Sequence, residues 1–220
     1  MTVSECKTSR RETRRQDRRD AILAVAQRSF CEHGYSATTM SAIAATLGGS
    51  KGTLWAYFPS KEALFTAVVD QATTAFRAQL SETLEPPGDI QPTLRNFCLR
   101  LMEKVVSPEA IALRRLIVAE AGRFPELGRI FYERAPRLTT ILLADFLDGA
   151  MTRGQLRADT PLDAAHFLIQ MCVSRCQQQL LFSLTDRIDA AQATADVDRA
   201  LDLFMRAYAP EKAAPSPTHA

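Results

Sequence analysis

The segment of residues 38–65 reads TTMSAIAATLGGSKGTLWAYFPSKEALF and constrains the fold of this 220-residue chain more than any other part. In its first half, apolar side chains recur at the three- and four-residue spacing of one helix face: Met40, Ile43, Ala44 and Leu47. Thr39 precedes them in the N-cap position, and Gly48 and Gly49 end the helix, where glycine adopts a left-handed backbone at little cost. A second short helix is expected over residues 50–58. Two short helices joined by a glycine turn predict a helix-turn-helix, whose second helix binds in the major groove of DNA.

The second helix is too short to bury all of its aromatic side chains. Leu54 and Phe58 lie four residues apart and are expected to face the core. Trp55 and Tyr57 cannot both share that inward face, so at least one of them points outward. An outward aromatic side chain on so short a helix indicates that this face meets a partner.

The residues from 50 to 65 resemble the recognition helix, and the segment that follows it, in the TetR family of bacterial transcriptional regulators. The matching sequences are SKGTLWAYF and PSKEALF, and the resemblance extends back to Phe30 and the turn of residues 33–35. Three positions depart from the residues usual in the family: Gly49, Trp55 and Ala56.

The resemblance implies an all-α fold with a three-helix DNA-binding domain that contains the helix-turn-helix. A larger helical domain for ligand binding and dimerisation would follow. The implied function is that of a homodimeric transcriptional repressor and not of an enzyme. It would bind double-stranded, near-palindromic operator DNA and be released by a small apolar ligand. Residues 114–127 also resemble a C-terminal domain type found in TetR regulators of efflux and stress genes.

The positions that match the family's DNA contacts are Thr39, Ser50, Lys51, Gly52, Thr53, Trp55, Tyr57 and Lys61. Gly52 has no side chain and lets the backbone approach a phosphate closely. Thr53 and Tyr57 supply hydroxyl groups, and Lys61 supplies a positive charge. We therefore expect these residues to form the DNA-binding surface.

Four segments are expected along the chain: a flexible basic arm (1–17), the DNA-binding domain (18–65), the ligand-binding and dimerisation domain (66–209) and a disordered tail (210–220). The periodicity predicts helices over residues 18–33, 39–47, 50–58, 60–84, 92–106, 108–122, 125–152, 161–184 and 190–208. Pro136 is expected to kink or split the seventh of these helices. No segment has the convincing pattern of a strand.

The positive charge of the chain is concentrated near its beginning. Residues 1–58 hold nine Lys or Arg and five Asp or Glu, a net charge of +4, whereas the whole chain carries +2. The clustered basic residues are Lys7, Arg10, Arg11, Arg14, Arg15, Arg18 and Arg19. A basic arm beside a helix-turn-helix is well placed to meet DNA phosphates or the minor groove. The alternative is a solvated, charged tail.

Apolar residues of the later helices suggest two further sites. A stripe on the last two helices suits a four-helix bundle between two subunits, with Ile169, Cys172, Val173, Cys176, Leu180, Val197, Leu201, Phe204 and Tyr208 in the dimer interface. The apolar ligand pocket is expected to be lined by Phe97, Leu101, Met102, Leu142, Phe146, Phe167 and Met171. Plain core packing is the alternative for each pocket residue.

The five cysteines are odd in number and scattered, which favours reduced thiols in a cytoplasmic protein over a disulfide framework. Cys172 and Cys176 lie four residues apart, so a thiol redox sensor is one alternative function, although both also fit an apolar core stripe. No Cys/His cluster has zinc spacing, and we expect no metal or cofactor. A helical enzyme or a protein-interaction module is the second alternative, but no catalytic motif supports it. No apolar run approaches the roughly 18 residues of a membrane span.

Overall fold

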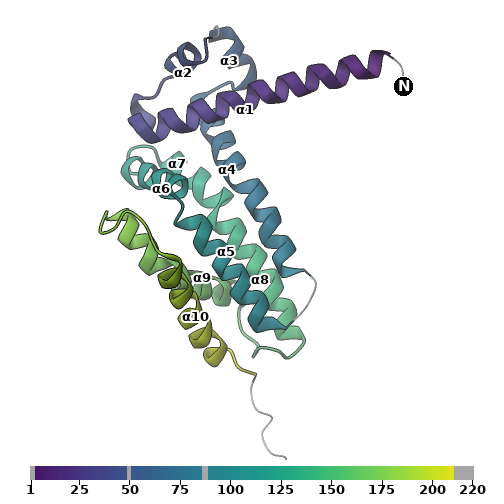
Figure 1. Cartoon of the computed structure of the whole chain (residues 1–220), viewed down its shortest axis with the longest axis vertical. Helices are drawn as coiled ribbons and strands as arrows, with labels where there is room; N and C mark the ends of the chain where they lie inside the picture. The colour runs from purple at the N-terminus through teal and green to yellow at the C-terminus, as the bar shows by residue number, and fades with distance from the viewer. Residues whose placement is uncertain (1–2, 49–50, 86–88, 211–220) are drawn as a thin grey trace, which may run out of the picture. The chain divides into compact units, whose positions relative to one another are not determined.

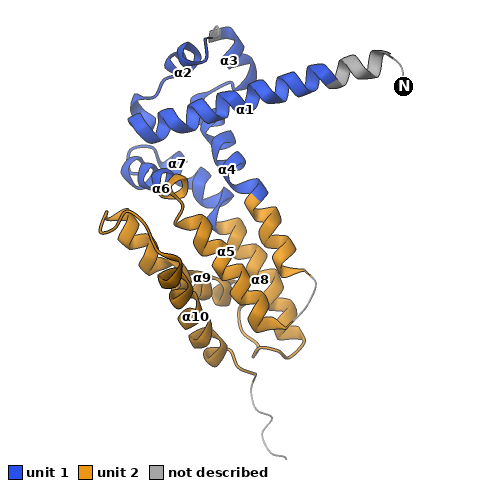
Figure 2. Cartoon of the chain, viewed as in Figure 1, with its two compact units in different colours: residues 1–75, 112–136 blue, residues 76–111, 137–220 orange. Residues whose placement is uncertain are grey.

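The computed structural model describes residues 3–48, 51–85 and 89–210, and for residues 3–9 and 51 it describes the backbone alone. Helices joined by turns and short loops make up these ranges, which contain no strand (Figure 1). The all-α prediction is confirmed. The chain divides into two compact units (Figure 2). Unit 1 comprises residues 1–75 and 112–136, and unit 2 comprises residues 76–111 and 137–220.

Unit 1 contains the predicted helix-turn-helix. Its helices are α1 (Val3–Ala37), α2 (Met40–Thr46), α3 (Lys51–Tyr57), the beginning of α4 (Lys61–Leu84), most of α6 (Pro108–Glu120) and α7 (Pro125–Arg134). One apolar cluster joins them, and its largest fully buried side chains are Ile22, Leu23, Phe30, Ile43, Leu64, Phe65 and Leu127. Burying one such side chain contributes about 1.5–3 kcal/mol. Isolated helices of seven residues are unstable in water, so this shared cluster is what stabilises α2 and α3.

The division of the chain into compact units differs from the predicted domain boundary at residue 65. The predicted boundary places α6 and α7 in the second domain. In the structure, Leu113, Leu116 and Ile117 of α6 and Leu127 of α7 pack in the apolar cluster of unit 1. The sequence pattern shows that these residues are buried, but it does not show which helices cover them.

The first helix is longer than predicted. α1 begins at Val3, so the flexible arm is incorrect for the described residues, because residues 3–17 are helical. No proline or glycine interrupts this segment, and arginine and glutamate are good helix formers. Gln16 Nε2 also donates a hydrogen bond of 2.9 Å to Asp20 Oδ1 one turn further on. The regular helix breaks at Gly34, which has φ +83° and ψ 162°.

Unit 2 is built around three helices that pack on one another. It contains the rest of α4, the start of α6, α5 (Ile90–Val105), α8 (Pro136–Thr152), α9 (Pro161–Leu181) and α10 (Ala190–Ala207). α9 and α10 pack against each other and against α5. The fully buried core side chains include Leu80, Leu94, Phe97, Met102, Leu143, Leu147, Leu168 and Phe204. The predicted split at Pro136 is confirmed, because α7 ends and α8 begins there.

The apolar stripe predicted as the dimer interface lies inside the chain. The residues buried in unit 2 are Cys172, Val173, Cys176, Leu180, Val197, Leu201, Phe204 and Tyr208, and Ile169 is partly buried against them. An amphipathic stripe shows that one helix face is covered, and here α5 and the neighbouring helix cover it. Eight of the nine predicted interface residues are thus buried within one chain and unavailable to a second subunit, whereas the contact predicted for Ile169 stays a prediction.

The predicted pocket residues do not all face the same space. Five lie in or against the core of unit 2: Phe97, Leu101, Met102, Leu142 and Phe146. Phe167 and Met171 are instead 54% and 39% exposed on the surface of α9. These two residues therefore do not line an interior pocket with the other five.

Candidate nucleic-acid interface

The sequence of α2 determines where this helix begins and ends. Thr39 has an extended backbone, and its Oγ1 accepts a hydrogen bond of 3.1 Å from the amide N of Ala42. The buried face consists of Met40, Ile43 and Ala44. Gly48 has φ +63°, a conformation that glycine adopts readily. Gly49 and Ser50 lie outside the described residues, so the contact expected of Ser50 stays a prediction.

α3 divides its residues between the core and an outward face. Leu54 and Phe58 are only 2% and 4% exposed, as their spacing predicts. Trp55 is 49% exposed and is therefore the outward aromatic side chain. The other exposed residues of α3 are Gly52, Thr53 and Ala56. Tyr57 is partly buried against the apolar cluster, and the side chain of Lys51 is not described.

The turn of residues 34–39, which we call the corner, joins α1 to α2 and orients the helix-turn-helix relative to α1. Thr38 is buried, and its Oγ1 lies 2.9 Å from the carbonyl oxygen of Ser29 and 2.8 Å from that of Gly34. A hydroxyl has one proton to donate, which these two acceptors share. The hydroxyl thus ties the start of α2 back to the end of α1.

Tyr35 packs its ring into the inside of this corner. The ring centroid lies 5.6 Å from that of Phe30, 5.7 Å from that of Phe65 and 5.3 Å from that of Phe124. Burial raises the pKa of the Tyr35 hydroxyl, and nearby carboxylates add to this effect. The ring of Phe30 is stacked on that of Tyr35, whereas those of Phe65 and Phe124 meet it edge-on, and aromatic pairs of both kinds contribute about 0.5–1.5 kcal/mol beyond the area they bury.

Lys61, the first residue of α4, holds the same corner with its ammonium group. Nζ donates hydrogen bonds to the carbonyl oxygens of Tyr35 at 2.8 Å and Thr38 at 3.1 Å, and it lies 4.2 Å from the centroid of the Tyr35 ring. Burial lowers the pKa of Lys61, and Glu120 opposes that shift. Because two of its three N–H groups are engaged, the phosphate contact predicted for Lys61 would have to use the third.

The end of α6 supports the corner from another direction. Glu120 Oε1 accepts a hydrogen bond of 3.2 Å from the backbone N of Ser36, and Arg123 Nη1 donates one of 3.3 Å to Ser36 Oγ. A Cβ atom on Gly34 would lie only 2.7 Å from Glu120 Oε1. The positive φ at position 34 favours glycine, and a side chain there would also push the Glu120 carboxylate away from Ser36.

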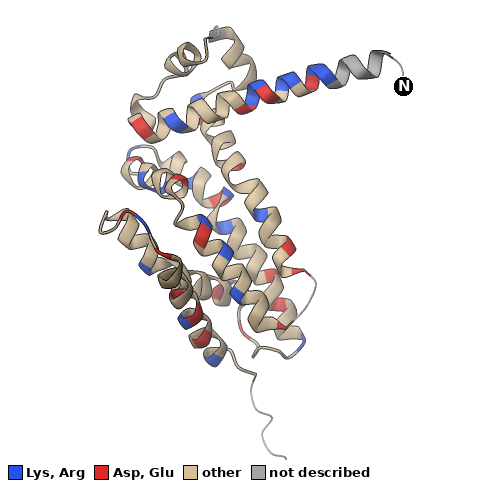
Figure 3. Ribbon diagram, viewed as in Figure 1, with Lys and Arg blue, Asp and Glu red and all other residues tan. Residues whose placement is uncertain are grey.

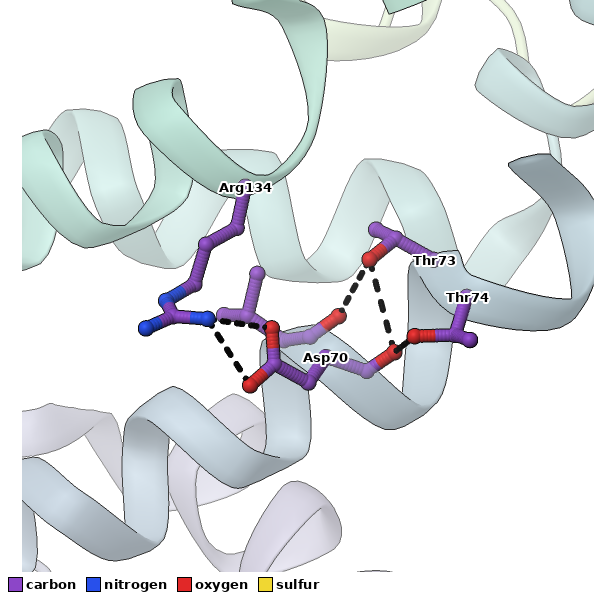
Figure 4. Close-up of polar contacts among 5 residues, drawn as sticks. Asp70, Thr73, Thr74 and Arg134 are labelled. Carbon is purple, nitrogen blue, oxygen red and sulfur yellow. Dashed lines mark hydrogen bonds and ion pairs between the residues drawn. The ribbon is translucent and has the colours of Figure 1, made fainter. Parts of the chain in front are cut away.

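An ion pair joins α7 to α4 within unit 1. Arg134 Nη1 donates to both carboxylate oxygens of Asp70, at 2.7 Å and 2.9 Å (Figure 4). One turn further along α4, Thr73 and Thr74 donate their hydroxyl protons to backbone carbonyl oxygens, those of Val69 and Asp70 respectively. Arg134 and Asp70 are 41% and 40% exposed, so this ion pair contributes only about 0.2–1 kcal/mol.

No sequence pattern predicted the contacts that Ser36, Glu120 and Arg123 make at the corner. Their partners are far apart in sequence, and no local spacing indicates them. The nearest signal is the resemblance noted for residues 114–127, which includes both charged residues but suggests no contact with α1. Among the described residues, no group of three or more His, Cys, Asp or Glu could hold a metal ion.

Comparison with protein families gives two matches that together cover most of the chain. Residues 22–68 match the family described as bacterial regulatory proteins, tetR family. Residues 92–210 match the C-terminal domain of AefR-like transcriptional repressors.

A curated relative and two solved structures resemble the chain over most of its length. The HTH-type transcriptional repressor AcnR of Corynebacterium diphtheriae is 25% identical over 189 residues, which cover 84% of this chain and 88% of AcnR. A TetR-family transcriptional regulator from Mesorhizobium loti MAFF303099 has a TM-score of 0.78 and 27% identity, covering 88% of this chain and 98% of that one. The flavonoid-responsive regulator FrrA has a TM-score of 0.75 and 32% identity, covering 90% of this chain and 100% of FrrA. No helix in the part of the chain that the structure describes is long and apolar enough to cross a membrane.

Replacing Lys61 by methionine should destabilise unit 1. The variant keeps an apolar side chain of similar length but leaves the carbonyl oxygens of Tyr35 and Thr38 without their donor, at a cost of about 1–3 kcal/mol. Urea unfolding followed by the fluorescence of Trp55, the single tryptophan of the chain, measures the change. Arg28→Met, at an exposed position on α1, serves as the control and should leave the midpoint unchanged. A Lys61→Met midpoint equal to that of the wild type would show that the ammonium does not support the corner.

Proposed function

The chain belongs to the TetR family of bacterial transcriptional regulators, and from this membership we propose how it recognises and releases its operator. The matching families and the relative AcnR are described as transcriptional regulators and repressors, which sets aside the alternative of a helical enzyme. In the proposal, a dimer places its two α3 helices in successive major grooves of a near-palindromic operator, about 34–36 Å apart. A small apolar effector then releases the DNA. The observation that carries this proposal is the outward face of α3.

The outward face of α3 is fixed in orientation and open to solvent. Leu54 and Phe58 anchor the other side of the helix in the core, which sets its rotation. Trp55 supplies an apolar surface for a thymine methyl group or a sugar, and an indole N–H donor. Thr53 supplies an exposed hydroxyl. Thr39 uses an oxygen lone pair to cap α2, so its own proton is available to a phosphate.

We place the dimer contact on the exposed face of α9 and α10. Phe167 and Met171 lie four residues apart on this face of α9, and Phe182 directly after the helix is 71% exposed. Leu203 of α10 is 47% exposed. Large apolar side chains that a single chain leaves exposed indicate an interaction site. A second copy is the proposed partner because TetR regulators typically dimerise, and a twofold contact pairs the same patch on both chains.

We place the effector in the interior of unit 2. Phe97, Leu101 and Met102 come from α5, whereas Leu142 and Phe146 come from α8. An apolar environment of this kind suits a small apolar molecule. Because FrrA is a flavonoid-responsive regulator, flavonoids are the first compounds to test. The effector would lower operator affinity by binding more tightly to the form that does not fit the operator. Control of efflux or stress genes stays a prediction.

The cysteines favour a structural role over redox sensing. Cys172 and Cys176 are buried in the core of unit 2. Burial, together with the hydrogen bond of 3.1 Å from Cys176 Sγ to Asp196 Oδ2, raises the pKa of Cys176 to about 12. A hydrogen bond to Cys172, with burial, raises the pKa of Cys98. Since the thiolate is the form that oxidants attack, Cys98 and Cys176 are poorly suited to sensing, and the buried Cys172 is shielded from oxidants by the core. They suit the reducing cytoplasm, where we propose that the protein acts.

Trp55→Ala should weaken operator binding without unfolding the chain. Removing a side chain that contacts DNA bases costs about 1–3 kcal/mol. Fluorescence anisotropy of labelled operator DNA measures affinity, and circular dichroism checks the fold. Tyr132→Ala is the matched control, because this aromatic side chain is 56% exposed on α7 of the same unit. Equal operator affinities for the two variants would place the DNA contact elsewhere.

Phe167→Asp and Met171→Asp should convert the dimer into a folded monomer. Both side chains are exposed within one chain, so a carboxylate there costs little until a second copy covers it. Light scattering gives the mass, and circular dichroism gives the helix content. Gln91→Asp, at an exposed position in the first turn of α5, introduces the same charge and should remain dimeric. A dimeric mass for both variants would exclude this face as the interface.

A flavonoid or another small apolar effector should raise the thermal midpoint of the protein while lowering its affinity for the operator. Preferential binding to the folded state gives about 2.7 kcal/mol of added stability at one hundred times Kd. Phe146→Ala should change the effector concentration needed for release and leave operator affinity in its absence unchanged. If no compound shifts operator affinity, the proposed effector control is incorrect.

A further inference from the structure

Arginines recur turn after turn along the N-terminal part of α1, where Figure 3 marks Lys and Arg in blue. Steps of four residues give two adjacent rows, one of Arg10, Arg14 and Arg18 and the other of Arg11, Arg15 and Arg19. At about 100° per residue, both rows fall within roughly half of the helix circumference. The remaining half carries Glu12, Thr13, Gln16, Asp17 and Asp20. A helix, unlike a flexible arm, therefore presents one continuous basic surface, which we call the arginine face.

Contacts within unit 1 fix how this helix is turned. On the acidic side, Asp20 Oδ1 accepts a hydrogen bond of 3.2 Å from Gln71 Nε2 of α4, in addition to the one from Gln16. On the basic side, the guanidinium carbon of Arg19 lies 5.4 Å from the centroid of the Phe58 ring, directly after α3. The arginine face thus begins beside the end of α3.

One arginine row lies on the same side of α1 as the apolar residues that this helix buries further along the chain. Residues that differ by eleven positions are about three full turns apart and share a side of the helix. The pairs that do so are Arg11 with Ile22, Arg15 with Ala26 and Arg19 with Phe30. The three apolar members are at most 1% exposed, whereas residues 10–17 are all exposed. In Figure 1 this part of α1 runs past α3, and none of the described elements of unit 1 covers it.

We propose that residues 10–19 of α1 act as a rigid helical extension whose arginine face binds the phosphates of duplex DNA beyond the stretch contacted by α3. This inference rests on the proposed operator binding. Ten helical residues span about 15 Å. At about 3.4 Å per base pair, that is the length of roughly four base pairs. Phosphate contacts carry no base readout, so the extension adds affinity for flanking DNA of any sequence.

The chemistry of the helix favours DNA over a lipid surface or an acidic protein. Arginine presents a planar fork of donors that pairs with phosphate in a bidentate manner. A helix that lies on a membrane has an apolar side opposite its basic side, whereas the opposite side here is acidic and polar. The arginine face also lacks the buried apolar or aromatic anchor typical of protein interfaces. Because Arg19 lies next to Phe58, one DNA duplex can meet both α3 and this face.

The test uses the full chain and an operator selected from random duplexes by the wild-type protein. One duplex ends at the operator, and the other extends about ten base pairs beyond it on each side. In the moved variant, T13R/R14T/R15Q/Q16R, composition and net charge are unchanged, but two arginines leave the arginine face. The neutral variant is R14Q/R15Q, and the conservative variant is R14K/R15K. Circular dichroism compares the helix content of all of them.

The wild type is expected to bind the extended duplex more tightly than the short one. The moved and neutral variants should both lose this gain, and the conservative variant should keep most of it. On the extended duplex, the log–log dependence of affinity on salt should become shallower by up to about 3.6 for the neutral variant. A dimer would lose four phosphate contacts, each of which contributes about 0.9.

Two results would overturn the inference. If the moved variant binds the extended duplex as well as the wild type does, the positive charge promotes DNA binding wherever it lies on α1, and the arginine face is not a binding surface. If every variant retains the full gain and the wild-type salt dependence, this face does not bind DNA, and an acidic protein or lipid surface becomes its candidate partner. Failure of the proposed function is distinguishable, because the wild type would then select no operator at all, and the inference would fall with it.

Discussion

The burial of Tyr35 at the corner between α1 and α2 is the contact on which the rest of unit 1 depends. α2 and α3 have only seven residues each, and helices of that length do not persist alone in water. Their position therefore comes from the packing below them. The Tyr35 ring meets Phe30, Phe65 and Phe124, and its carbonyl accepts a hydrogen bond from the ammonium of Lys61. The outward orientation of Trp55 follows from this arrangement, because Leu54 and Phe58 are buried in the same core and fix the rotation of α3.

The residues that support the corner come from segments far along the chain. Glu120 and Arg123 reach Ser36 from the end of α6, and Arg134 of α7 binds Asp70 of α4. Both α4 and α6 begin in one compact unit and end in the other. A displacement of the end of α6 would break the hydrogen bonds of Ser36 and disturb the packing of Tyr35. This covalent connection would give the proposed effector of unit 2 a physical route to the helix-turn-helix.

Local sequence patterns predicted the elements whose environment is local. The spacing of Leu54 and Phe58 correctly assigned them to the core, and Thr39 caps α2 as expected. The same reasoning failed for the stripe that includes Val197 and Leu201. That stripe is indeed covered, but by helices of the same chain rather than by a second subunit. The exposed Phe167 and Met171 show the opposite error, because an apolar side chain in a helix was assumed to face the interior.

The sequence by itself determined the helix-turn-helix, the all-α fold, the family resemblance and the concentration of arginines before Ile22. These features depend on residue type and short-range spacing, which are the same whatever tertiary contacts the chain makes. Only the tertiary structure decided that Lys61 binds two backbone carbonyls, that α6 and α7 pack with the DNA-binding helices, and that the arginines share one side of α1. The physical reason is that periodicity specifies whether a face is buried and composition specifies its charge. Which atoms cover that face, and where the charge points, depend on contacts between residues that are distant in sequence.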